Sequence, residues 1–286
     1  MKKFLLAIIG TLVLLAGVAL VCYPFISNTL MEQNQASEIT TQSNAVKNTS
    51  NEKLNKAFKD ARKYNKSLLG SIVLTDPFDP GFQDENNPEY YNLLNINNDS
   101  IMANIEIPKI RVTLPIFHGT SSEVLEKGAG HLQKTSLPVG GKSTHCVITG
   151  HTGLSSARLF TDICQLKKGD VFYINVLNKR LAYKVDKIQT VLPNNTEPLK
   201  IVPNKDYVTL VTCTPYGVNS HRLFVRGTRI KLNEADKISD KTSPIETLWM
   251  KKYKQGLIIG AMAIVVILIL FFIIRTIRRK RKNNKA

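Results

Sequence analysis

The sequence is poor in the residues from which metal sites and disulfides are built. It holds four cysteines and five histidines in 286 residues, with no C-x-x-C pair and no His-x-x-x-His spacing. Because structural zinc sites need four such ligands at close spacing, we expect no metal and no cofactor. Cys22 lies in an apolar run, and the other three cysteines leave at least one thiol unpaired. Nothing in the sequence decides whether Cys146 and Cys164 form a disulfide.

Acidic residues are absent from both ends of the chain, and the whole sequence carries a net charge of +17. Nine of the 39 basic residues lie in residues 1–27 and 275–286, which leaves 30 basic and 22 acidic residues between these ends. The middle of the chain therefore has a net charge of +8. It lacks a basic cluster with base-stacking aromatic residues, so we expect no nucleic-acid partner.

Two uncharged apolar segments, residues 4–26 and 256–274, are long enough to cross a membrane. Each is close to the roughly 20 residues that span a bilayer core. Two lysines precede the first segment and seven basic residues follow the second. Because basic flanks mark the cytoplasmic side, we expect a two-pass protein of the cell membrane. Both termini are then cytoplasmic, and the domain between the anchors is on the extracellular face.

The first segment has two alternative interpretations, a cleaved signal peptide and a lipid-modified Cys22. The apolar run is longer than the core of a signal peptide, and residues 19–21 are a poor cleavage triplet. Val21 stands where a lipidation site needs a small residue. An uncleaved anchor over residues 1–27 is the favoured interpretation.

The part of the chain between the two anchors divides into segments that differ in composition and hydrophobic pattern. Residues 28–70 combine a polar stretch typical of a stalk with an amphipathic helix from Leu54 to Leu68, preceded by a capping box at Thr49 and Glu52. Residues 71–100 predict a loop rich in turn-forming residues. Three further segments complete the division: a barrel domain over residues 101–232, a polar linker over residues 233–255, and a second anchor over residues 256–274 followed by a cytoplasmic tail over residues 275–286.

Residues 101–232 contain eight short alternating or β-branched runs, which predict strands. The runs are residues 104–107, 112–116, 146–149, 171–176, 181–185, 188–192, 208–212 and 223–230. Short helices are expected at residues 122–127 and 157–166, and Asn178-Lys179 suits a hairpin turn. Eight short strands with small helices indicate a mainly β protein that forms a closed or nearly closed β-barrel.

One pair of runs carries candidate chemistry. A β-branched run ends in Cys213, and Arg222 opens the next run nine residues later. If the runs pair antiparallel, the guanidinium lies beside the thiol, where it lowers the thiol pKa and could stabilise an oxyanion. The alternatives are a core cysteine and a surface arginine. A nucleophilic cysteine also needs a base. His151, flanked by glycines at a predicted strand end, is one candidate, but position alone does not separate it from the other four histidines.

Three of these residues match the motifs of a known family. Residues 209–213 resemble the cysteine motif of sortases, the Gram-positive transpeptidases that join surface proteins to the envelope or to one another. Arg222 matches the family arginine, and His151 matches the family histidine. The resemblance covers about residues 101–230 and implies the eight-stranded sortase barrel. It also implies that Cys213 is the nucleophile, His151 the general acid and base, and Arg222 the oxyanion stabiliser.

Two more features resemble the pilus-assembling class C branch of sortases. One is the second apolar segment, and the other is Asp76-Pro77-Phe78, which is similar to the Asp-Pro-aromatic lid motif of that branch. The resemblance implies that Asp76 lies by Arg222 and that Phe78 covers Cys213. Without the resemblance, Asp-Pro is a common way to start a turn.

The resemblance implies a membrane-embedded cysteine transpeptidase whose partners are pilin subunits. It would cleave an LPxTG-like sorting signal between Thr and Gly and transfer the acyl group to a pilin lysine. A sortase that uses a peptidoglycan amine and a cysteine hydrolase of cell-wall peptides remain alternatives. A wall-anchored surface protein would need an LPxTG-like signal just before residue 256, and residues 243–247 do not fit one.

Overall fold

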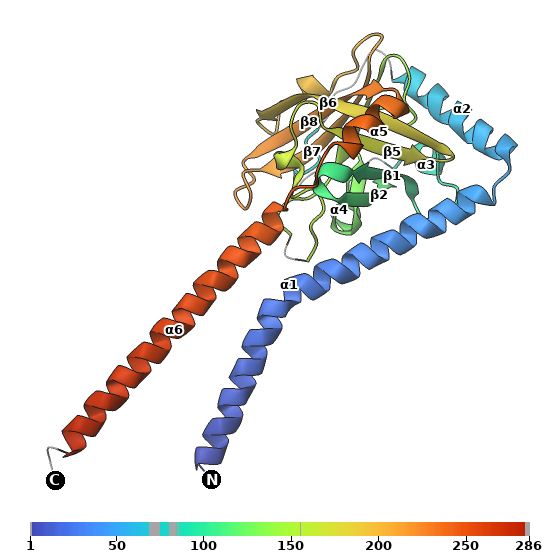
Figure 1. Cartoon of the computed structure of the whole chain (residues 1–286). Helices are drawn as coiled ribbons and strands as arrows, with labels where there is room; N and C mark the ends of the chain where they lie inside the picture. Colours follow the sequence, from blue (N-terminus) through green and yellow to red (C-terminus); the bar gives the residue numbers. More distant parts are fainter. Residues whose placement is uncertain (1, 69–74, 80–83, 85, 155, 284–286) are drawn as a thin grey trace. The chain divides into compact units, whose positions relative to one another are not determined.

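The computed structural model describes residues 2–68, 75–79, 84, 86–154 and 156–283 (Figure 1). The chain divides into two compact units, Met1–Ile245 and Glu246–Ala286. The second unit contains helix α6 (Leu248–Asn283). The first unit contains helix α1 (Lys2–Lys47), helix α2 (Asn51–Ser67) and a β-barrel with short helices around it.

Eight strands close into a barrel in the order β1-β2-β3-β4-β7-β8-β6-β5. The β2–β3 and β4–β7 pairs are parallel, and the other six pairs are antiparallel. Closure leaves no strand edge free to pair with another chain. The strands are β1 (Ile101–Ile107), β2 (Val112–His118), β3 (Ala129–His131), β4 (Thr144–Thr149), β5 (Val171–Val176), β6 (Lys179–Val191), β7 (Asp206–Thr214) and β8 (His221–Ile230). The predicted eight-stranded barrel is confirmed.

The barrel is filled by aliphatic and aromatic side chains from every wall. Ile105, Ile148, Leu210 and Val225 are completely buried in one cluster. Burying a side chain of this size contributes about 1.5–3 kcal/mol to folding. The core therefore fixes the strands whose ends carry Cys213 and Arg222.

Two strands differ from the prediction. The two runs predicted at residues 181–185 and 188–192 form the single strand β6, which ends at Val191, because an irregularity between Val185 and Lys187 shifts the alternation without breaking the strand. Strand β3 was not predicted, since three residues with two small side chains carry no pattern of their own. The turn between β5 and β6 comprises Leu177 and Asn178, one residue earlier than expected, because Val176 pairs with Lys179.

The polar stretch interpreted as a stalk is helical, since α1 continues as one helix to Lys47. Its polar side chains make specific contacts with the barrel domain. The amide of Gln35 donates to the carbonyl of Lys127 at 2.8 Å, and the amide of Gln42 donates to the carbonyl of Ile101 at 2.8 Å. Low hydrophobicity predicted an irregular segment, but these buried amides satisfy main-chain oxygens of the domain.

The remaining helices agree with the sequence only in part. The predicted helix at residues 122–127 is confirmed as α4 (Ser122–Lys127), and α2 is confirmed with Ser50 rather than Thr49 as its N-cap. In place of the helix expected at residues 157–166, the structure has only the short 3-10 helix η2 (Ile163–Gln165). Part of the expected linker is helix α5 (Leu232–Asp240). The other short elements are α3 (Pro88–Asn92), η1 (Pro108–Ile110) and η3 (Glu197–Leu199).

Both terminal helices are long and apolar enough to cross a membrane. The qualifying parts are Ile8–Lys47 of α1 and Tyr253–Ile277 of α6, and none of the apolar window of either is buried. These helices fit the two anchors expected from the sequence.

Candidate active site

Cys213 and Arg222 lie opposite each other at one end of the barrel. Strands β7 and β8 are antiparallel, and their register pairs Cys213 with Arg222. Residues directly opposite in such a pair have Cβ atoms about 4.5–5.5 Å apart. Both side chains are buried, with 9% of Cys213 and 7% of Arg222 exposed. The pairing assumed from the sequence is therefore present.

His151 reaches the same end of the barrel from the neighbouring strand. Strands β4 and β7 run parallel, with Thr149 beside Val211. One residue further, the amide of Gly150 donates to the carbonyl of Val211 at 3.0 Å, and the hydroxyl of Thr212 donates to the carbonyl of Gly150 at 2.6 Å. These bonds carry the parallel register past the end of β4, so His151 lies level with Cys213.

Gly150 is required here for space. A Cβ atom at this position would lie 2.7 Å from the ring of Phe160. The amide of Phe160 also donates to the carbonyl of His151 at 3.0 Å. The bare backbone at Gly150 thus allows the following loop to fold back on His151.

The other four histidines have structural contacts. His118, His131 and His145 are buried, and both ring nitrogens of each contact a polar group of the protein. Burial lowers the pKa of His131 to about 3 and that of His145 to about 4. His221 pairs with Thr214, and its Nδ1 lies 2.9 Å from the hydroxyl of Ser220. Geometry separates His151 from these four, which position in the sequence alone could not do.

Asp76 forms a two-point ion pair with Arg222. The Nε atom of Arg222 donates to Oδ1 at 2.8 Å, and Nη2 donates to Oδ2 at 2.6 Å. The Nη1 atom donates to the carbonyls of Asn219 and His221 at 2.9 and 3.1 Å. Each of the three guanidinium nitrogens is therefore already engaged.

Phe78 lies between His151 and Arg222. Its ring centroid is 5.6 Å from that of His151 and 5.2 Å from Cζ of Arg222. Pro77 is buried beside it. The segment Asp76–Phe78 thus contacts both candidate partners of Cys213. Residues 71–74, 80–83 and 85 of the expected loop lie outside the described residues.

Burial controls the protonation of the site. It raises the pKa of the Cys213 thiol to about 11, with Arg222 acting to lower the pKa and Asp76 acting to raise it. Burial also lowers the pKa of His151, which the charge of Glu126 partly opposes. At neutral pH the arrangement therefore contains a neutral thiol and a neutral imidazole.

Cys146, which is buried, and Cys164, which is exposed, are not joined by a disulfide. Among the residues that the structure describes, no group of three or more His, Cys, Asp or Glu side chains could hold a metal ion.

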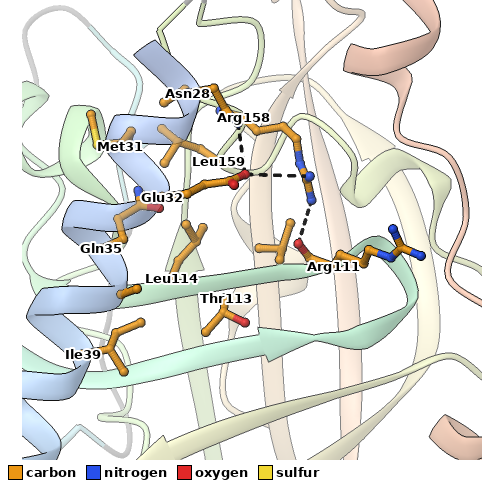
Figure 2. Close-up of a pocket in the computed structure, with 13 residues that line it drawn as sticks. Asn28, Met31, Glu32, Gln35, Ile39, Arg111, Thr113, Leu114, Arg158 and Leu159 are labelled. Atoms are coloured by element: carbon orange, nitrogen blue, oxygen red, sulfur yellow. Dashed lines mark hydrogen bonds and ion pairs between the residues drawn. The ribbon is translucent and has the colours of Figure 1, made fainter. Parts of the chain in front are cut away.

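Arg158 joins the loop after His151 to α1 and to the turn before β2. It forms an ion pair with the fully buried Asp162 at 3.2 Å, and its Nη2 donates to the carbonyls of Ile110 and Arg111 at 2.6 and 2.8 Å. Dashed lines in Figure 2 run from Arg158 to Glu32 on α1 and to the main chain of Arg111, beside a hollow of about 200 Å³. Sequence reasoning missed this residue, because nothing distinguishes it there from a surface arginine.

Comparison with known proteins shows which family the chain resembles. The family model described as "Sortase domain" matches residues 105–230. Sortase A of Streptococcus agalactiae is 30% identical over 162 residues, which cover 56% of this chain and 64% of that protein. The chain thus spans less than two thirds of this relative. Sortase A of Bacillus anthracis is 25% identical over 226 residues, covering 79% of this chain and 95% of the relative.

Solved structures of sortases C are more similar in sequence. The crystal structure of sortase C-1 from Actinomyces oris is 50% identical, covers 63% of this chain and 99% of its own, and superposes with a TM-score of 0.60. The pilus-related sortase C of Group B Streptococcus is 44% identical, covers 66% of this chain and 95% of its own, and superposes with a TM-score of 0.61.

Proposed function

Because the chain belongs to the sortase family, we propose that it is a class C transpeptidase that polymerises pilin subunits. Sortases are cysteine transpeptidases, and the similar solved structures include a pilus-related sortase C. The observation that carries the proposal is the pairing of Cys213 with Arg222, with His151 beside them at the same end of the barrel. The substrate is a pilin with an LPxTG-like sorting signal.

Acylation begins when Cys213 loses its proton to His151 and its sulfur attacks the threonine carbonyl of the signal. The guanidinium of Arg222 stabilises the tetrahedral oxyanion, because it offers fixed charged donors. The C–N bond to glycine then breaks, and His151 returns the proton to the departing amine. The products are a thioester on Cys213 and the free C-terminal part of the signal.

Resolution uses the ε-amine of a pilin lysine. The amine attacks the thioester carbonyl, His151 takes the amine proton, and the sulfur of Cys213 leaves and is reprotonated. An isopeptide bond now joins two subunits, and the enzyme is restored. A peptidoglycan amine as acceptor would make the protein a wall-anchoring sortase, and water would make it a hydrolase.

Asp76, Pro77 and Phe78 act as a lid in this proposal. The ion pair to Asp76 occupies the Arg222 nitrogens that the oxyanion needs, and Phe78 contacts both His151 and Arg222. Acyl transfer therefore requires these three residues to move away first. Such gating restricts access to the thiol when no signal is bound.

The test is a product analysis with the purified full-length protein in detergent. A peptide with an LPxTG-like signal is incubated with a lysine-containing pilin peptide, with an oligoglycine amine, or with neither. The proposal expects the lysine isopeptide as the main product and its loss in Cys213→Ala. A preference for oligoglycine supports wall anchoring, and free acid at the same rate in all three mixtures supports hydrolysis.

The domain between the two apolar helices faces the cell exterior in this proposal, and both termini are cytoplasmic. Support comes from the two membrane-length helices and from the seven basic residues after residue 274. Protease treatment of intact protoplasts should remove the domain but leave a C-terminal tag intact. Loss of the tag would contradict this topology.

A further inference from the structure

Six basic side chains line a groove at the far end of the barrel from Cys213. The groove has a volume of about 810 Å³ and lies between α2, the loop of residues 140–144 and the start of β6. One of its fourteen lining residues is acidic, Asp60, and that carboxylate pairs with Lys56 at 2.9 Å. The basic residues, all exposed, are Lys59, Arg62, Lys63, Lys66, Lys142 and Lys179.

The groove is separate from the candidate active site. Thr144, which lines it, pairs with Asp206 at the first residue of β7. Cys213 lies seven residues further along this strand. At about 3.3 Å per residue, the two positions are about 23 Å apart.

Buried contacts hold the walls of the groove in place. The side chain of Asn65 on α2 is buried and exchanges two hydrogen bonds with the main chain of Leu137, at 2.7 and 3.1 Å. The ring of the buried Phe58 lies 4.1 Å from Nζ of Lys179 and 4.8 Å from Cζ of Arg62. The Phe58 ring thus contacts one cation from α2, Arg62, and one from β6, Lys179.

The basic side chains of the groove are not paired with carboxylates of the described part of the chain. None of the six forms an ion pair with any described carboxylate. The nearby Asp206 accepts from the hydroxyl of Tyr183 and the amide of Gly141 instead. On α2 the basic residues follow each other at spacings of three and four, where like charges repel and cost helix stability. A bound anion would relieve this repulsion.

We propose that this groove binds a linear polyanion that carries phosphate groups. Five of the six cations are lysines, and lysine binds phosphate groups as a point charge. Neighbouring basic side chains on one helix face are about 5–6 Å apart, so a chain with charges in series can pair with several of them at once. The site is independent of the acyl transfer at Cys213.

The experiment measures binding of inorganic polyphosphate to the full-length protein in a neutral detergent, at low and at moderate salt. The groove variant is Lys59→Glu with Lys63→Glu and Lys142→Glu. The control variant, Lys168→Glu with Lys187→Glu and Lys241→Glu, changes the net charge equally at exposed positions outside the groove. Since binding depends on local charge pairing, we expect the groove variant to lose about tenfold or more in affinity and the control to lose less than about threefold.

Equal loss in the two variants, or no binding by the parent protein, would overturn the proposal. Two further arms test the ligand: polyglutamate that binds as tightly as polyphosphate, or binding to anionic vesicles alone, would also overturn it. If charge reversal perturbs folding, the glutamine variants at the same three positions replace it, with a smaller loss expected. Transpeptidation plays no part in this readout, so the result stands apart from the proposed function.

Discussion

Asp76 and Arg222 are 146 residues apart in the sequence, yet their side chains form a two-point ion pair at 2.8 and 2.6 Å. Each side chain is only 8% exposed. This contact ties the segment Asp76–Phe78 to the strand opposite Cys213. On the proposed mechanism the same guanidinium must later hold an oxyanion, so the ion pair and the reaction compete for it.

Replacement of Asp76 should make the thiol of Cys213 more acidic. The charge of Asp76 acts to raise the thiol pKa, and Arg222 acts to lower it. In Asp76→Asn the raising charge is gone, so the pKa should fall from its value of about 11. Because the thiolate is the reactive form, alkylation of Cys213 should reach its half-maximal rate at a lower pH than in the parent protein.

The control for this prediction is Asp186→Asn. Asp186 makes the same kind of two-point contact with Arg226, at 3.0 and 2.8 Å, on the strand that carries Arg222. Peptide mass analysis separates the label on Cys213 from that on the exposed Cys164. Identical pH profiles in Asp76→Asn and the parent would refute the electrostatic coupling.

Removal of the Phe78 ring should open the site. The ring contacts His151 and Arg222, and two such contacts contribute about 1–2 kcal/mol. Since 1.4 kcal/mol corresponds to a factor of ten, alkylation of Cys213 in Phe78→Ala should be about tenfold faster at fixed pH. Phe78→Tyr keeps the ring and should react at the parent rate. Equal rates in Phe78→Ala and Phe78→Tyr would exclude a shielding role.

Arg222→Lys should reduce transpeptidation far more than Arg226→Lys. Lysine keeps the charge but loses the planar fork that can align two donors. Loss of an oxyanion donor costs about 10²–10³ in kcat, so this is the expected decrease for Arg222→Lys. Arg226 lies four residues further along β8, and its replacement should change kcat less than about threefold. Steady-state kinetics with a sorting-signal peptide measures kcat for both variants. An equal decrease of kcat in Arg222→Lys and Arg226→Lys would contradict an oxyanion role for Arg222.

Arg158→Met should destabilise the domain strongly. It leaves Asp162, which is fully buried, without its cationic partner. Breaking a buried pair from one side costs about 3–5 kcal/mol. Glu32→Gln, at an exposed partner 3.9 Å from Arg158, should cost less than about 1 kcal/mol. Thermal unfolding of the full chain in detergent checks both values, and similar melting temperatures for the two variants would show that the buried pair has no such role.

The sequence predicted the barrel and the Cys213–Arg222 pair because both depend on local patterns. Two strands joined by a short turn pair antiparallel, so the end of the first strand, with Cys213, lies beside the start of the second, with Arg222. Strand β3 has only three residues, two of them small, and its pairing with β2 and β4 is set by the fold as a whole. No local sequence pattern therefore predicts strand β3.

Position in the sequence alone did not single out His151, which the family resemblance selected, and the end of α1 needed three-dimensional information. His145 is buried and hydrogen-bonded, whereas His151 lies level with Cys213. A single histidine in a sequence does not show how deeply its side chain is buried. The polar part of α1 looked irregular because it has few apolar residues. Its helical course depends on Gln35 and Gln42 reaching main-chain carbonyls more than 50 residues away, at separations of 92 and 59 residues.

The most direct measurement is intact-mass analysis of the full-length protein after brief incubation with an LPxTG-like peptide and no amine. The account predicts an adduct that equals the peptide up to its threonine, located on Cys213, which disappears when a pilin lysine peptide is added. Absence of this adduct on Cys213, or its formation in Cys213→Ala, would contradict the account.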